Sequence, residues 1–595
     1  MLFALLPVSQ SLFAQADERL RAIACLTGAY SVEELDEQEI ERFTAFLSRP
    51  LEINSATRSR MLSSGLLSQY QVASLIDYRT RAGDVLSFSE LASIDGFGEE
   101  LANALKPFIS LRSRSLPGQP YQSYKAVSNE ALARFAVKGN EYNYGAKYRL
   151  DYADAVELSL AARTRYSGMN QFPPSAWSAN IAYYGNKSLG KILVGDFNAR
   201  FGQGLTLWSG MSLSGLSSSA SFYRRPSGIS PSWSWSGTGS HRGVAADFSV
   251  GRIVISALAS FPGLRTWCES GKRAEISSLA GGNIAYYGRH GQLSLTGYCL
   301  TEPLIISRKP SGGKVSADFR CSWRGVDLFG EAAWDFLGAC MGFVTGTVVP
   351  FGNEWRVSSV IRCYPKDFSS EYTGGVRGWT KTSDEAGVAV GLERSGISAT
   401  VDVAMKDGEH SKRQLKALFK APVQLSGTSV LTVRITERYR PYEEVLKFRT
   451  GARCDFDWSS SGLSARYGPS DNPAWKMRIR AEGLLCRSLA GLWYVEGGRK
   501  TDRFSVYLRG TIFIVDHWDD RIYSYERDAP GNFTVPAYYG RGWSAFIAAG
   551  GKFMSGIRKT KTLKCYLRAS TVQYSFMKEP KRPVSEVKVQ FVLDL

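Results

Sequence analysis

The sequence predicts a mainly β fold, a large transmembrane antiparallel β-barrel of about 22–26 strands preceded by a small all-α region. Charged and apolar side chains alternate along one segment after another, and many of these segments are 9 to 13 residues long. That length is close to the ~9–11 residues with which a tilted strand crosses a bilayer. The series continues for over 400 residues without a helical interruption.

The segment 445–458 shows the alternation most clearly. Lys447, Arg449 and Arg453 occupy odd positions, whereas Phe448 and Phe456 occupy even positions. Successive side chains of a strand point to opposite faces, so this strand has one charged and one apolar face. In a soluble sandwich the charged face meets water, but in a membrane barrel the apolar face meets lipid. The strand lengths, the long series and an amphipathic last strand ending at Leu595 favour the barrel.

Alternating segments number 24, with five before residue 202 and 19 after residue 242. Between these groups, residues 211–241 are rich in Ser, Gly, Pro and Trp, which predicts a long loop outside the cell or folded into the lumen. Residues 516–541 predict a second long loop, which we expect to be external.

Four parts follow along the chain. Residues 1–16 resemble a secretory signal peptide because an apolar segment precedes an A-x-A pattern at residues 14–16; a buried N-terminal helix is the alternative. Residues 17–111 predict an α-helical region, in which Ser31 is a candidate helix cap, and residues 112–124 a linker with two prolines. Residues 125–595 form the predicted barrel. No apolar stretch of ~18 residues is present, as a barrel of the Gram-negative outer membrane requires, and we expect a periplasmic N-terminal region.

Charge is unevenly distributed. Residues 17–115 contain 11 Lys and Arg against 15 Asp and Glu, whereas the rest of the chain contains 62 against 40. Charges are costly on a lipid-facing surface, so most of this excess must line the lumen or the loops. A basic lumen attracts anions. The simpler interpretation is a basic wall neutralised by salt and lipid head groups.

The candidate lumen cations lie on three neighbouring predicted strands. They are Arg434, Arg438, Lys447, Arg449, Arg453, Lys476, Arg478 and Arg480. Asp455 and Asp457 share their strand face with two of these arginines, which indicates ion pairs within the lumen and not general acid–base catalysis.

No catalytic or metal-binding pattern emerges. The four histidines are scattered without metal-ligand spacing, there is no C-x-x-C, and several of the nine cysteines are in phase with the apolar residues of their strands. No nucleophile motif G-x-S-x-G has its strand–turn–helix context. We therefore expect no enzyme activity, no metal and no cofactor.

Residues 50–111 carry a spaced motif. It runs through Leu51-Glu52-Ile53-Asn54-Ser55-Ala56, Gly65-Leu66-Leu67, Tyr78-Arg79, Phe88-Ser89-Glu90-Leu91 and Gly96-Phe97-Gly98. This order resembles the tandem helix-hairpin-helix domain of the ComEA family. Together with segments at 189–210 and 361–372, the chain also resembles large Bacteroidetes-type proteins that fuse such a region to an outer-membrane β-barrel. The resemblance covers most of the chain.

The resemblance implies DNA as a partner. Hairpins of this family hold the DNA backbone, because glycines allow a tight turn that presents amide groups to phosphate without reading bases. The residues that match these positions are Gly96, Phe97, Gly98, Gly65, Leu66, Arg58 and Arg79. The first hairpin lacks a second glycine, Glu99 and Glu100 follow the second hairpin, and residues 51–115 hold seven basic and seven acidic residues.

Two functions follow from the sequence. In the first, the barrel binds or passes DNA without sequence specificity, in a competence-like uptake. In the alternative, an outer-membrane transport or assembly protein uses its helical region to dock a periplasmic protein and does not bind DNA. In both, the barrel surface contacts outer-membrane lipid.

Overall fold

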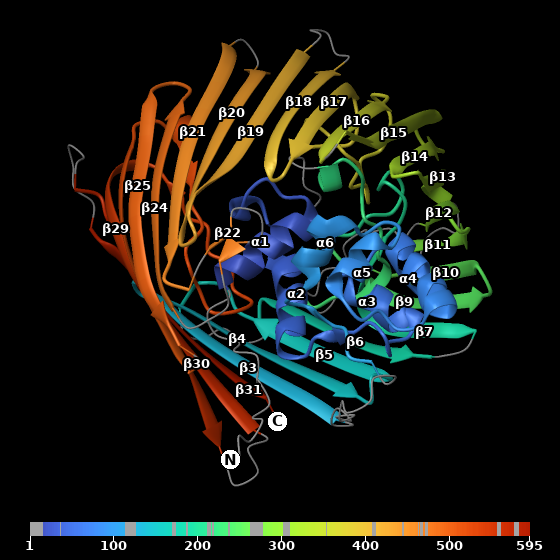
Figure 1. Cartoon of the computed structure of the whole chain (residues 1–595), viewed down its shortest axis with the longest axis horizontal. Helices are drawn as coiled ribbons and strands as arrows, with labels where there is room; N and C mark the ends of the chain where they lie inside the picture. The colour runs from blue at the N-terminus through green and yellow to red at the C-terminus, as the bar shows by residue number, and fades with distance from the viewer. Residues whose placement is uncertain are drawn as a thin grey trace.

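A closed antiparallel β-barrel surrounds a helical region in the computed structural model of the chain (Figure 1). The structure describes residues 16–35, 37–113, 127–168, 174–185, 188–210, 216, 219–235, 239–261, 278–301, 310–352, 354–406, 412–442, 445–461, 463–464, 468–469, 474–501, 503–555, 561–575 and 582–594. Almost all of the predicted signal peptide, most of the predicted linker and the final Leu595 lie outside these residues.

The barrel confirms the predicted fold class. Its ring contains 24 strands that pair in chain order and closes where the first, β3, pairs with the last, β31. The strands of the ring are β3 (Val127–Lys138), β4 (Glu141–Tyr152), β5 (Val156–Arg163), β6 (Ala176–Tyr184), β7 (Leu189–Arg200), β9 (His241–Val250), β10 (Ile253–Ser260), β11 (Ser278–Tyr287), β12 (Gly291–Thr301), β13 (Pro310–Trp323), β14 (Val326–Asp335), β15 (Cys340–Phe351), β16 (Trp355–Tyr364), β17 (Glu385–Arg394), β18 (Ile397–Lys406), β19 (Lys412–Ser426), β20 (Ser429–Tyr442), β21 (Val445–Ser459), β24 (Ala474–Leu485), β25 (Leu489–Lys500), β26 (Phe504–Val515), β29 (Gly540–Ser555), β30 (Lys561–Gln573) and β31 (Val584–Asp594).

Side-chain alternation sorts these strands into an apolar outer face and a polar inner face. In β13, Val315, Phe319 and Trp323 are 41%, 41% and 63% exposed, whereas Lys314 and Asp318 are 1% and 3% exposed. The exposed face is apolar because it meets lipid, and the covered face is polar because it lines the lumen. The eight described cysteines are all free.

The N-terminal part forms six helices. These are α1 (Ala16–Thr27), α2 (Glu37–Ser48), α3 (Arg58–Ser64), α4 (Gln69–Ala82), α5 (Phe88–Ser93) and α6 (Gly98–Leu105), with the short 3₁₀ turn η1 (Val32–Glu34) between the first two. Side-chain caps start three of them: Thr57 accepts from the Arg60 amide, Ser68 forms a capping box with Gln71, and Ser87 accepts from the Glu90 amide. In the described residues, none of the helices is long and apolar enough to cross a membrane.

Ser31 does not cap a helix with its side chain, contrary to the expectation from the sequence. Ser31 precedes η1 and makes no capping hydrogen bond. Glu34 instead accepts a hydrogen bond from the backbone amide of Tyr30 at 3.1 Å, and the second helix begins only at Glu37. The acidic residues after Ser31 are used for contacts with the barrel wall, as described below.

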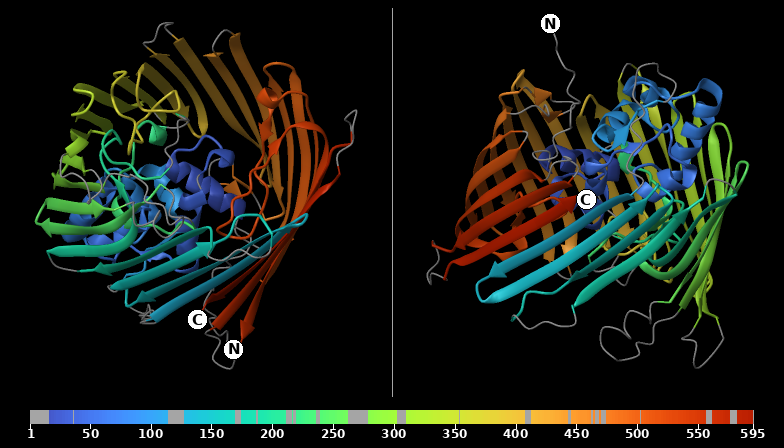
Figure 2. Two further views of the ribbon diagram at one scale, coloured as in Figure 1. Left: turned by 180° about the vertical axis from the view of Figure 1, so that it is seen from behind. Right: turned by 90° about the horizontal axis from the view of Figure 1, so that it is seen from below.

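The helical region packs around one apolar core within the ring of strands. Leu20, Ile40, Met61 and Leu105 are buried in this core, and β1 (Leu51–Glu52) and β2 (Ile109–Ser110) pair in parallel beside it. Both views of Figure 2 show the helices enclosed by the barrel wall. The sequence predicted a helical region that precedes the barrel, and the structure places that region in the lumen. We call residues 16–113 the plug.

Two barrel segments turn inward and complete the core of the plug. Residues 219–235, which contain the 3₁₀ turn η2 (Ser219–Ser221) and β8 (Gly228–Pro231), contribute Trp233. Residues 516–539 contribute Tyr525 and contain η3 (Trp518–Asp520), β27 (Ile522–Tyr523) and β28 (Ala537–Tyr538). The second segment was expected to be external, but Tyr525 is buried and Phe533 is partly buried against the helices, whereas Trp518, Tyr523 and Tyr539 are exposed. Elsewhere, β22 (Leu463–Ser464) and β23 (Gly468–Pro469) form a small hairpin.

The two mouths of the barrel differ. At the mouth where β3 begins and β31 ends, the connections include the short turns 153–155, 251–252, 324–325 and 395–396. The connections at the opposite mouth include the long segments 201–240, 365–384 and 516–539. We call these the terminal mouth and the loop mouth.

Candidate functional site

Glu33 of η1 anchors the plug to the barrel wall. Its two carboxylate oxygens lie 2.8 Å from Nη1 of Arg480 and 3.1 Å from Nη1 of Arg453. Asp455 also bridges these two arginines, at 2.7 Å from Nε of Arg480 and 2.8 Å from Nε of Arg453. Burial raises the pKa of Glu33, but attraction by Arg453 and Arg434 outweighs it and holds the pKa at about 2. Glu33 is therefore ionised at neutral pH.

A second anchor joins α3 to another part of the wall. The Arg60 guanidinium of α3 pairs with Asp151 of β4 and, at 2.7 Å, with Glu157 of β5. Arg49 reaches Asp151 at 3.2 Å and Asp154 at 3.0 Å. Additional pairs fix α1 and α2, including Arg21 with Asp457 at 2.5 Å and Glu39 with Arg200 at 2.8 Å. Removing one partner of such a buried pair leaves a charge without compensation, so the plug is held firmly from several sides.

The predicted lumen cations contribute to these pairs or to the lining beside them. Arg453 and Arg480 bind Glu33, Arg434 lies 3.3 Å from Asp455, and Arg478 lies 2.6 Å from Asp457. Arg449 donates to the backbone carbonyl of Arg521 at 2.9 Å. Arg438 and Lys476 are half-buried and make further interactions, and the side chain of Lys447 lies outside the described residues.

The first predicted hairpin turn, between α3 and α4, is covered by the barrel segment 225–228. The backbone carbonyl of Leu66 accepts from Arg225 at 2.9 Å, and the Gln69 amide at the start of α4 donates to the carbonyl of Pro226 at 2.8 Å. Gly65 has a φ of +66°, and a Cβ there would lie 2.1 Å from Cζ of Arg42. The Gln69 amide, which could otherwise bind a phosphate at the start of α4, is thus already bonded to Pro226.

The second predicted turn, between α5 and α6, is more open. Gly96 and Gly98 have φ values of +87° and +70°, and a Cβ on Gly98 would meet nothing within 4 Å. Phe97 is buried in the core of the plug. Asp95 lies 3.3 Å from Nδ1 of His290 in the turn after β11, which places this hairpin at the terminal mouth.

The two arginines expected beside these hairpins make internal contacts. Arg58 lies over the ring of Tyr287 with 5.0 Å to its centroid. Arg79 donates to the backbone carbonyls of Ile53 and Ala56 at 3.1 Å and 3.3 Å. Both side chains stabilise the packing of the plug.

Three of the hollows between the plug and the wall lie on the side where the barrel closes. The loop-side hollow, of about 500 Å³, is lined by Arg134, Arg163, Arg165, Glu586 and Lys588 near the loop mouth. The middle hollow, of about 100 Å³, is lined by Glu41, Glu130, Lys147, Lys564 and Val592. The terminal-side hollow, of about 70 Å³, is lined by α1 and α2 on one side and by β26, β29 and β30 on the other.

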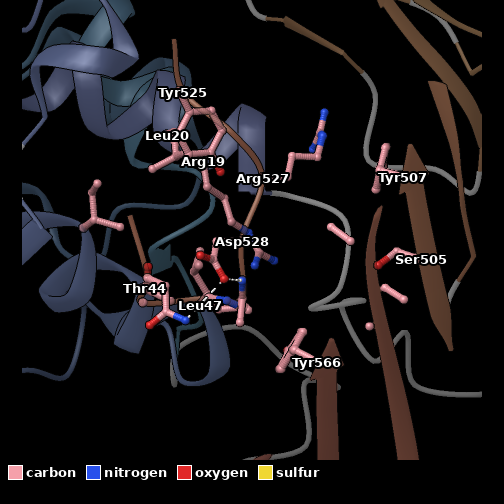
Figure 3. A pocket seen from close by; sticks show the side chains of 18 of the residues that line it. Arg19, Leu20, Thr44, Leu47, Ser505, Tyr507, Tyr525, Arg527, Asp528 and Tyr566 are labelled. Carbon is pink, nitrogen blue, oxygen red and sulfur yellow. Dashed lines mark hydrogen bonds between the residues drawn. The ribbon is translucent and has the colours of Figure 1, made fainter. Parts of the chain in front are cut away.

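Figure 3 shows the terminal-side hollow. Arg19, Leu20, Thr44 and Leu47 project from the helices, and Ser505, Tyr507 and Tyr566 project from the facing strands. Tyr525, Arg527 and Asp528 of the inward segment stand between the two sides. At about 70 Å³, this mainly apolar space has room for only a few water-sized molecules.

One residue, Asn532, lines all three hollows. Its side chain accepts from Nη1 of Arg134 at 2.6 Å and donates to Gln590 at 3.0 Å. Asp528, four residues earlier, binds Nζ of Lys588 at 3.0 Å. Burial raises the pKa of Asp528, but Lys588 and Arg568 lower it more, to about 2. The turn at residues 528–532, which we call the gate turn, is therefore pinned to the wall and separates the hollows.

The middle hollow contains an unusual carboxyl group. Glu41 of α2 lies 2.8 Å from Nζ of Lys147, yet burial raises its pKa to about 7 despite that partner. In the described part of the chain, there is no group of three or more His, Cys, Asp or Glu side chains that could hold a metal ion.

Sequence reasoning did not find the gate turn or the hollows. The sequence feature that could have indicated the gate turn is the segment 516–541, which is rich in aromatic and charged residues and long enough to fold into the lumen. The wall residues of the hollows lie on strands at both ends of the barrel sequence, and only closure of the ring brings β3 beside β31.

The closed ring, its apolar exterior and its polar interior define a transmembrane β-barrel of the outer-membrane type whose lumen holds its own N-terminal helices.

No protein-family model matches the sequence, and no curated protein matches it. Solved structures with a similar barrel include OccK11 (OpdR) of Pseudomonas aeruginosa, at 8% identity, with a TM-score of 0.26 over 79% of this chain and 94% of that one. A BenF-like porin from Pseudomonas fluorescens Pf-5 is 11% identical, with a TM-score of 0.25 over 79% and 98% of the two chains. The ferric-catecholate import receptor Fiu of E. coli K12 is 9% identical, with a TM-score of 0.36 over 78% and 81%. Likeness at this level concerns the fold alone.

Proposed function

We propose that this chain is an outer-membrane transport protein that carries small solutes along the side of a fixed plug. The observation that supports this function most directly is a set of three hollows between the plug and the wall, all lined by Asn532. The gate turn is the constriction of this path, and passage requires its displacement from the wall.

The orientation follows from the connections between strands. Outer-membrane barrels have short turns on the periplasmic side and longer loops outside the cell. The terminal mouth, with its short turns, then faces the periplasm, and the loop-side hollow opens to the exterior. In this orientation the second hairpin of the plug, at Gly96 and Gly98, faces the periplasm.

The ion pairs favour a moving gate turn over a moving plug. Withdrawal of the plug would separate Glu33 from two arginines and Arg60 from two carboxylates, all of them buried ion pairs. Displacement of residues 528–532 breaks a smaller set of contacts, chiefly those of Asp528 and Asn532.

Solute flux into liposomes tests this function. The full chain with residues 529–531 deleted should admit a small neutral sugar faster than the native chain, because the constriction is shortened. A deletion of equal length elsewhere at the loop mouth, in the segment 365–384, serves as the control. If the gate-turn deletion leaves flux at the level of protein-free liposomes, the proposed path does not exist.

Passage or capture of DNA is the second candidate. The open position of Gly98 favours it, since its surroundings leave room beside the second hairpin for a phosphate group. Binding of labelled duplex DNA to the full chain, titrated against salt, tests it beside a Gly98→Glu variant. Binding that weakens with salt and is lost in this variant supports DNA capture; equal binding by both proteins, or none, rejects this site.

A periplasmic protein could instead bind the same face of the plug. Leu86, between α4 and α5, is 50% exposed and lies in the half of the plug that carries the open hairpin. A partner captured from periplasmic extract by the native chain, retained after nuclease treatment and lost with Leu86→Asp, would favour docking. Retention of the partner by the Leu86→Asp variant would reject this surface.

A further inference from the structure

The loop-side hollow differs from the other two because it is lined by more cationic side chains, some of which have no carboxylate partner. Arg134, Arg163, Arg165 and Lys588 converge on it from β3, from the end of β5 and from β31. Only two carboxylates, Glu37 and Glu586, line the same space. The hollow thus carries an excess of cations in a partly enclosed space that is open to solvent.

Lys588 and Arg163 already face carboxylates, Lys588 at Asp528 and Glu586 and Arg163 at Glu37, so Arg134 and Arg165 make up the excess. Glu586 already accepts from Tyr166 at 2.6 Å and Arg568 at 3.0 Å, and lies 3.4 Å from Lys588. Glu37 makes only a loose contact with Arg163, at 3.6 Å. Their charges are therefore engaged within the wall or at the plug surface.

Two guanidinium groups retain donors for a ligand. Arg165 is exposed, and the described residues include no partner for its side chain. Nε of Arg134 is buried without an acceptor among the described atoms, although the other nitrogens of this side chain bind Asn532 and Asn143. Arg134 also lies over the ring of Trp235, with 4.9 Å to its centroid, which holds the guanidinium in place. The planar guanidinium of Arg165 can bind carboxylate or phosphate oxygens through paired hydrogen bonds, and Arg134 offers one further donor, Nε.

We propose that the loop-side hollow is a binding site for a small oxyanion, a carboxylate or phosphate, with Arg165 as the capturing residue and Arg134 as the inner contact. This inference rests on the transport function proposed above and assigns the substrate class of its outer site. The ligand is small because the hollow between the plug, the wall and the gate turn has a volume of about 500 Å³. Glu586 and Lys588 then form the boundary between this site and the gate turn.

Equilibrium dialysis of the full chain in detergent, with citrate and with inorganic phosphate in separate arms, tests the site without requiring transport. Choline is the cationic comparison. Arg165→Gln should weaken anion binding about tenfold, since a hydrogen bond between charged groups contributes ~1.5–3 kcal/mol. Arg165→Lys, which keeps the charge, should retain part of the affinity. Lys138→Gln, which removes one exposed charge from the last residue of β3 at the same mouth, should leave binding unchanged.

The outcomes separate this site from the proposed function. Binding of citrate, of phosphate or of both that depends on Arg165 supports the site and assigns its chemistry. Absence of anion binding, or equal weakening by Lys138→Gln, overturns it. Flux of a neutral sugar through the gate-turn deletion, measured in parallel, reports on the transport path alone, so anion binding and sugar flux can fail independently.

Discussion

Glu33 and Arg480 lie 2.8 Å apart although 447 residues separate them in the sequence. This contact joins the first turns of the plug to the barrel wall, and Arg453 completes the same cluster. The barrel and the plug are thus joined by ion pairs in both directions, with Glu33 on wall arginines and Arg60 on wall carboxylates.

Substitution of Glu33 by Ala should loosen the plug. The change leaves Arg453 and Arg480 facing each other with only Asp455 between them, at a cost of about 3 kcal/mol, toward the lower end of the range for broken buried pairs. Pulse proteolysis in urea reports the loss as cleavage within residues 16–48 at lower denaturant. Asp77→Asn, in an exposed pair with Arg81, is the control and should change little. Unchanged proteolysis of the Glu33 variant would contradict the anchor.

The free energy of unfolding of the plug should fall as pH rises through the range in which Glu41 titrates. The group is protonated in the folded protein up to about pH 7 but ionises near the ordinary glutamate value of 4.5 when the chain is unfolded. Between these two pKa values the folded state binds more protons, so the free energy of unfolding decreases with rising pH, by up to roughly 3 kcal/mol in total.

Glu41→Gln tests this pH dependence because it removes the titrating group and keeps its shape. Urea midpoints from pulse proteolysis at pH 5 and pH 8 should differ in the native protein and converge in the variant. An identical difference in both proteins would assign the pH dependence to another group.

Charge on the lipid-facing surface should be tolerated only near the membrane boundary. Leu295 is 57% exposed in the middle of β12, and Val250 is 68% exposed at the end of β9. Leu295→Arg should cost about 2–4 kcal/mol and Val250→Arg about 0–1 kcal/mol, because the penalty depends on depth. Folding into liposomes from urea measures both variants. Equal costs would mean that these strands do not cross a bilayer at the expected depth.

Release of the gate turn should raise solute flux. Asp528→Asn removes the partner of Lys588 and weakens the attachment of residues 528–532 to the wall. Because the pKa of Asp528 is about 2, its stabilising contribution is present above the unfolded pKa and is lost only as pH falls through about 2, so native flux should not change for this reason between pH 5 and 8.

The matched control for this prediction is Asp516→Asn in the same segment. Asp516 pairs with Arg541 on an exposed surface away from the hollows. Faster sugar uptake with Asp528→Asn and native uptake with Asp516→Asn are expected. Equal uptake by both variants would remove the gate turn from the path.

Much of the barrel could be predicted from the sequence because its strands obey a local rule. In β13 the alternation of Lys314, Val315 and Ser316 is enough to separate lumen from lipid, since side-chain direction reverses at each residue. The count of 24 strands followed from repeating that rule along the chain. The helices at 58–64, 69–82, 88–93 and 98–105 likewise fall in the motif between residues 50 and 111.

The position of the plug could not be predicted in this way. The acidic residues around Glu33 indicate an exposed helix face when only neighbours in sequence are considered, and the two arginine partners of Glu33 itself lie more than 400 residues away. The hollows depend on the same long-range closure, because Arg134 and Lys588 come from opposite ends of the barrel sequence. The inward turn of residues 516–539 depends on burial of Tyr525 and Phe533 against helices that the segment's own pattern does not reveal.

A disulfide between the plug and the wall tests the central claim, that solutes pass while the plug stays in place. Ser59 of α3 faces Gly190 of β7, where an added Cβ would lie 2.6 Å from Oγ of Ser59, so a cysteine pair at these positions is close enough to bond. The pair is introduced into the chain lacking residues 529–531, with each single cysteine as a control, and neutral sugar flux is measured after oxidation and after reduction. The account predicts equal flux in both states. Flux that stops on oxidation and returns on reduction, in the double variant alone, would show that the plug itself must move and would contradict a path along its side.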